Sequence, residues 1–89
     1  MVIYKYVVPG SKSFFDLELP LGAEILAFQK QDNTPVIWVL IDEHHPQIET
    51  RHFAVRGTSE AMNDWRSSDI YIGTVQISPF VWHLFETKK

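Results

Sequence analysis

The chain has 89 residues, enough for one domain, and we expect a single β domain over residues 1–89. Its hydrophobic content of 45% argues against disorder, and the lack of cysteine excludes disulfide bonds as a source of stability. The net charge is −3 and the eight Lys and Arg residues are scattered, which excludes the clustered cations that nucleic-acid binding needs.

Alternating apolar and polar residues recur along the whole chain and predict strands separated by turns. The predicted strands are Val2–Val8, Phe14–Leu19, Ala23–Gln31, Pro35–Asp42, Ile48–Arg56, Ile70–Ile77 and Phe80–Glu86. Asp32 and Asn33 suit a tight hairpin turn between the third and fourth strands, and Ser78–Pro79 joins the last two. The pattern predicts an all-β fold, either a compact antiparallel sandwich or a small barrel of about seven strands.

Residues 58–69 are the one stretch without β character. Thr58 or Ser59 is suited to cap a single helical turn there, and Trp65 would pin that turn to the rest of the domain. An irregular loop is an equal alternative. We therefore expect at most one short helical turn in the chain.

Two of the predicted strands are apolar on both faces. Val36–Ile41 is apolar at every position, and Phe80–Phe85 is interrupted only by His83. A strand of this kind must be covered on both sides, either by a second sheet or by another protein chain. We therefore expect a sandwich or barrel that also forms a homo-oligomer, most simply a two-fold dimer.

The start of the chain gives no sign of a targeting segment. Met1 is followed by the strand-like residues Val2–Tyr4 and not by a basic stretch and an apolar core, so we expect no signal peptide. The longest apolar run, Val36–Ile41, is too short to cross a membrane. These features predict a soluble cytoplasmic protein with no membrane partner.

Residues 42–45 contain the side chains that metals prefer, namely Asp42, Glu43, His44 and His45. Adjacent histidines in an extended segment point in opposite directions, so we interpret the segment as a solvated loop. A metal site stays open as the alternative. The chain has no Gly-x-Ser-x-Gly motif, no cysteine nucleophile and no Gly-rich phosphate loop. We therefore expect neither an enzyme nor a bound cofactor.

The candidate ligand site consists of Arg51 and Arg56 on the fifth predicted strand, with Trp38, Trp82 and His83. Arginine next to tryptophan can hold an anionic or planar ligand by paired hydrogen bonds and by stacking. If the chain sequesters a small signalling molecule, we expect these residues to line one concave surface, although alternation places Arg51 and Arg56 on opposite faces of their strand. The alternative is that the arginines are charges at a strand edge and that the tryptophans belong to the core.

Six segments of the chain carry a family resemblance. They are Tyr4–Tyr6, Leu19–Leu26, Pro35–Asp42, Thr50–Thr58, Tyr71–Thr74 and Val81–Glu86. In content and order they resemble a family of small phage and prophage proteins of unknown function. Members of that family often have Gly-Thr-Gly where this chain has Gly57, Thr58 and Ser59. The resemblance implies a phage or prophage source and supplies no catalytic motif.

Three classes of function follow from these observations. The favoured class is a non-catalytic, phage-encoded binding module in the host cytoplasm. It would act as a counter-defence protein, by occupying a host protein or by sequestering a small anionic signalling molecule. The second class is a structural or assembly component of the phage particle. The third is a metal-dependent enzyme whose residues converge only in the folded chain.

Overall fold

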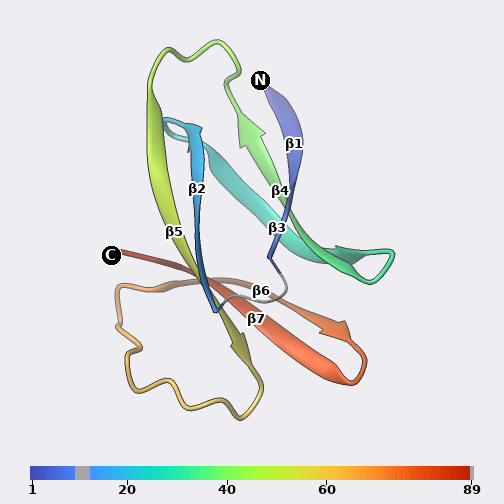
Figure 1. The fold of residues 1–89 in the computed structure, drawn as a ribbon. Coiled ribbons are helices and arrows are strands. Elements are labelled where there is room, and N and C mark those ends of the chain that lie inside the picture. The colour runs from blue at the N-terminus through green and yellow to red at the C-terminus, as the bar shows by residue number, and fades with distance from the viewer. Residues whose placement is uncertain (10–12, 89) are drawn as a thin grey trace.

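The computed structural model describes residues 1–9 and 13–88 and contains seven strands in two antiparallel sheets (Figure 1). The strands are β1 (Val2–Val7), β2 (Phe14–Pro20), β3 (Glu24–Gln31), β4 (Thr34–Ile41), β5 (Ile48–Gly57), β6 (Ile70–Ile77) and β7 (Phe80–Thr87). Each lies within one residue of a predicted strand at either end. The all-β prediction from alternating side chains is therefore confirmed.

Among the described residues, the two sheets meet by side-chain packing and not by strand pairing. One sheet has the strand order β1-β4-β3 and the other β2-β5-β7-β6, and no ladder connects them within the described residues. Their main approach is between β3 and β6. There Phe28 lies so close to Gly73 that a Cβ on this glycine would sit 3.2 Å from the Cβ of Phe28. The fold is therefore a sandwich and not a closed barrel, a choice that the alternation had left open.

The core lies between the inward faces of the two sheets. Ile37, Val39 and Ile41 of β4 alternate with residues that point outward, and they join one buried cluster with Phe53 and Leu84 of the other sheet. Full burial of each large apolar side chain stabilises the fold by roughly 1.5–3 kcal/mol. The other buried members of the cluster are Val8, Phe15, Leu19, Ala23, Phe28 and Val75.

Residues with positive φ form the tight turns. Asp32 and Asn33 have φ angles of 50° and 64°, which gives the two-residue hairpin between β3 and β4 that their side chains predict. Gly22 has a φ of 80° in the turn between β2 and β3, where a side chain would be strained. The hairpin between β6 and β7 turns at Ser78–Pro79, as predicted, with a cis peptide bond.

Residues 58–69 form an irregular loop, drawn in yellow and orange at the lower left of Figure 1. Isolated turns occur along it, for example where the amide of Trp65 donates to the carbonyl of Met62 at 3.1 Å. Trp65 is exposed, so it does not pin the segment as expected. Of the two alternatives, the structure contains the loop and not the helical turn. Within residues 1–9 and 13–88, no helix has the length and apolarity to cross a bilayer.

Candidate functional site

The five predicted ligand-binding residues are distributed over several surfaces. Arg51 and Arg56 lie an odd number of positions apart on β5, so their side chains point to opposite faces of the sheet. Trp82 and His83 are neighbours on β7 and diverge in the same way, while Trp38 lies on the other sheet. The structure therefore does not bring these residues together around one cavity, because one strand cannot present both of its faces to the same ligand.

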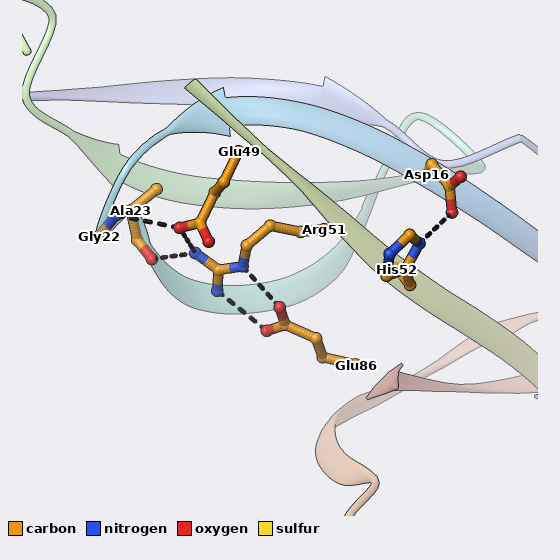
Figure 2. A network of polar contacts seen from close by, with 7 residues as sticks. All are labelled: Asp16, Gly22, Ala23, Glu49, Arg51, His52 and Glu86. Carbon is orange, nitrogen blue, oxygen red and sulfur yellow. Dashed lines mark hydrogen bonds and ion pairs between the residues drawn. The ribbon is translucent and has the colours of Figure 1, made fainter. Parts of the chain in front are cut away.

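Arg51 is held inside the chain by partners from two other segments (Figure 2). Its Nε and Nη2 atoms donate to the two carboxylate oxygens of Glu86 at 2.5 and 2.9 Å, and Nη1 donates to the carbonyl of Ala23 at 2.6 Å. Glu49 lies 3.7 Å from Nη1, and its carboxylate also accepts the amide of Gly22 at 3.0 Å. The hydrogen bonds to Glu86 raise the pKa of Arg51 above its usual value.

This network gives Arg51 a structural role. The guanidinium joins β5 to β7 and to the turn between β2 and β3, and its three nitrogens all have partners within the chain. A guanidinium can leave water only when carboxylates or carbonyls replace its hydration. Anion binding by Arg51 would have to displace Glu86. Ligand binding by Arg51 stays a prediction, and the pair with Glu86 does not favour it.

Arg56 holds the 58–69 loop against the outer face of the four-stranded sheet. Its side chain is only 8% exposed, and Nη2 lies 2.9 Å from both carboxylate oxygens of Asp64. Nη1 donates to Glu60 at 3.5 Å, and the guanidinium carbon lies 4.8 Å above the ring of Phe14. The hydrogen bond from Arg56 lowers the pKa of Asp64. Like Arg51, this arginine is neutralised within the chain.

The two candidate residues on β7, Trp82 and His83, also have partners within the chain. The two ring nitrogens of His83 lie 2.8 Å from the hydroxyl of Thr58 and 2.9 Å from that of Thr74. Trp82 packs against the core cluster and over Gly57, where a Cβ would be 3.3 Å from its ring. Trp82 therefore follows the alternative interpretation, in which the tryptophan belongs to the core.

A cavity of about 450 Å³ lies between the 58–69 loop and the outer face of β2 and β5. His52 and Asp16 line it as a hydrogen-bonded pair, with 2.8 Å between Nδ1 and the carboxylate (Figure 2). Among the described residues, Asp16 is the hydrogen-bond partner of the His52 ring. Among the described residues, the charged side chains that line the cavity are balanced in sign: Asp16, Asp64 and Asp69 against Arg56, Arg66 and Lys88. These residues alone give the cavity no excess positive charge to select an anion.

An apolar surface lies on the outer face of the three-stranded sheet, and sequence reasoning did not identify it as a site. We call it the Trp38 face. It comprises Ile3, Lys5 and Val7 of β1, Trp38 and Leu40 of β4, and Glu24, Ala27 and Gln29 of β3. Val36 of β4 is on the same side of the sheet but is buried beneath its neighbours. Ile3 and Val7 are 58% and 57% exposed. The indole of Trp38, at the centre, donates to Gln29 at 2.9 Å. The signal was present in the doubly apolar strand, which the sequence analysis attributed to cover by a second sheet or by another copy of the chain.

In residues 42–45, Glu43 lies 3.5 Å from the amino terminus of Met1, and the other contacts are local. The amide of His44 donates to Asp42 at 3.1 Å, and the His44 ring lies 3.3 Å from Glu43. The ring of His45 accepts the amide of Gln47 at 3.0 Å. Over the described parts of the chain, no three His, Asp or Glu side chains converge as metal ligands would.

Comparison with known proteins places the chain in a family. The model of Domain of unknown function (DUF7352) matches residues 1–89. The chain belongs to this family. Its resemblance to a family of unknown function is therefore confirmed, whereas the phage source expected with it stays a prediction. No curated protein matches the chain, and no solved structure matches it. Membership in DUF7352 thus supplies no activity, and function has to be argued from the surfaces described above.

Proposed function

We propose that this chain is a non-catalytic binding module that docks on a protein partner through the Trp38 face. If the chain is phage-encoded, the partner is a host protein whose function is blocked by occupancy. The observation that carries the proposal is the row of apolar side chains around Trp38 on a sheet face with no covering layer among the described residues.

The composition of the Trp38 face supports a protein partner. Its centre is apolar, and Lys5, Glu24 and Gln29 lie on the two outer strands, which is the arrangement of a protein interface with a dry centre and a polar rim. Tryptophan is among the residue types that contribute most to interface affinity. A small anionic ligand is disfavoured because Arg51 and Arg56 already bind carboxylates within the chain.

The exposure of the Trp38 face points the same way. More than half of the surface of Ile3 and of Val7 is open to water. Large exposed apolar patches rimmed by polar residues usually mark interaction sites in soluble proteins. Covering Ile3, Val7 and Trp38 would remove this unfavourable contact with water, and that gain would drive the association.

Position-resolved crosslinking tests the proposal. A photoreactive benzophenone amino acid is placed at Ile3 and, as a matched control, at Glu18, which is exposed on the outer face of the other sheet. Both variants are expressed in the source organism, and any adduct specific to position 3 is identified by mass spectrometry. The identified partner is then purified and titrated with the wild-type chain.

The expected result is loss of affinity when the Trp38 face is changed. Trp38→Ala should weaken the purified complex by roughly 30-fold or more, as a central interface tryptophan does, while Glu18→Ala should leave it unchanged. Ile3→Ser is a second variant, because this exposed side chain can be replaced without disturbing the core. Equal affinity for all variants would overturn the proposal, and unlimited self-assembly would instead favour a particle component.

A further inference from the structure

The free edge of β1 borders the Trp38 face. β1 is hydrogen-bonded to β4 on one side, and no strand among the described residues pairs with its other side. An unpaired edge presents backbone donors and acceptors that another extended chain can use. The edge is short, and one lysine is its only charged residue.

One hydrogen bond establishes which residues face outward. The amide of Val8 donates to the carbonyl of Pro35 at 2.9 Å, and this pair continues the register in which Val7 lies opposite Val36. Opposed residues in an antiparallel ladder alternate between hydrogen-bonded and non-hydrogen-bonded pairs. Even-numbered residues of β1 therefore bond to β4. The N–H and C=O groups of Ile3, Lys5 and Val7 point away from the sheet.

The same three residues place their side chains on the Trp38 face. Ile3 and Val7 flank Lys5, whose ammonium donates to Gln31 at 2.6 Å and remains exposed. On this face, a strand added at the edge would therefore lie beside apolar Ile3, cationic Lys5 and apolar Val7, at every second position of β1. Opposite charges in such cross-strand pairs stabilise the pairing, and like charges oppose it.

We infer that the β1 edge accepts an extended segment of the protein partner, with an acidic residue opposite Lys5 and apolar residues two positions to either side. The inference rests on the proposed function, because the added strand extends the Trp38 face. A second copy of the chain is the less suitable occupant. Antiparallel pairing of two β1 strands about Lys5 would place two lysines directly opposite each other.

Synthetic peptides test the edge directly. The probe is the capped peptide Thr-Val-Thr-Glu-Thr-Val-Thr, and its matched control has Lys in place of Glu. Each is titrated to millimolar concentration against the isotopically labelled chain and followed by amide NMR. We expect the acidic peptide to shift the amides of Ile3, Lys5 and Val7 and to bind about fivefold more tightly than the control. In the Lys5→Glu variant this preference should reverse.

N-methylation separates strand addition from charge attraction alone. Methylating the amide of the central Glu removes a donor that faces β1, so binding should be lost. Methylating the adjacent Thr, whose amide points away, should leave binding unchanged. Equal effects of the two methylations, or no shift with any peptide, would overturn the inference. A dimer of the free chain in which two β1 edges are hydrogen-bonded to each other would also overturn it, because the occupant would then be a second copy.

The two proposals fail in distinguishable ways. If the crosslinked partner depends on Trp38 while the peptides do not bind, the strand addition is wrong and the docking face stands. If the peptides bind with the expected preference while Trp38→Ala leaves the partner's affinity unchanged, the edge is a strand-binding site and the Trp38 face is not the docking surface.

Discussion

Replacing Arg51 by alanine is expected to weaken the fold while leaving the Trp38 face able to bind. Arg51 lies on the inward side of β5, whereas the Trp38 face is the outer side of the other sheet. The variant would break the bidentate pair with Glu86 and the hydrogen bond to Ala23. It would also leave the Glu86 carboxylate in a partly buried position without its main partner.

The expected loss is about 2–3 kcal/mol of unfolding free energy. Removing one member of a fully buried ion pair costs roughly 3–5 kcal/mol. The side chains of Arg51 and Glu86 are 16% and 19% exposed, so water recovers part of that loss. A domain of this size has a total stability of roughly 4–13 kcal/mol, so the change is large enough to measure.

Urea unfolding followed by tryptophan fluorescence and circular dichroism measures the effect. Lys30→Ala, at an exposed cation on β3, is the matched control and should change stability by less than about 0.5 kcal/mol. Arg51→Lys keeps the charge but not the paired hydrogen bonds, so it should give an intermediate value. If Arg51→Ala lowers the unfolding free energy no more than Lys30→Ala does, the guanidinium does not stabilise the fold. Its availability to an anionic ligand would then have to be reconsidered.

Three further outcomes follow from the structure. Arg56→Gln should release the 58–69 loop, seen as faster amide exchange there with the strands unaffected. Because Arg56 lowers the pKa of Asp64, this contact should persist above the ordinary aspartate pKa near 4 and be lost at lower pH. The carboxyl carbon resonance of Asp64 can follow that loss. An ordinary pKa for Asp64 would contradict the predicted contact with Arg56. In the absence of a partner, two copies should pair through the Trp38 face. A monomer mass by light scattering at micromolar concentration would refute this dimer.

The strands and the hairpin turns were determined by local sequence. Alternation has a period of two, so it fixes which residues share a face of a strand regardless of what packs on that face. Asp32 and Asn33 tolerate positive φ, so the hairpin between β3 and β4 follows from two residues and their apolar flanks. The local sequence also showed that β4 is apolar on both faces. The inner face of β4 belongs to the core, as this pattern indicated, whereas cover of the outer face by another chain stays a prediction.

The partners of the two arginines were decided by the tertiary structure. Glu86 lies 35 residues after Arg51 in sequence, and it meets the guanidinium because β5 and β7 are neighbours in the sheet. Alternation does not specify strand order, so the chain gave no sign of which carboxylate would neutralise which cation. The same order leaves β1 at an edge and Trp38 on an outer face. A long-range contact depends on the whole arrangement of strands, whereas a turn or a face depends on a few adjacent residues.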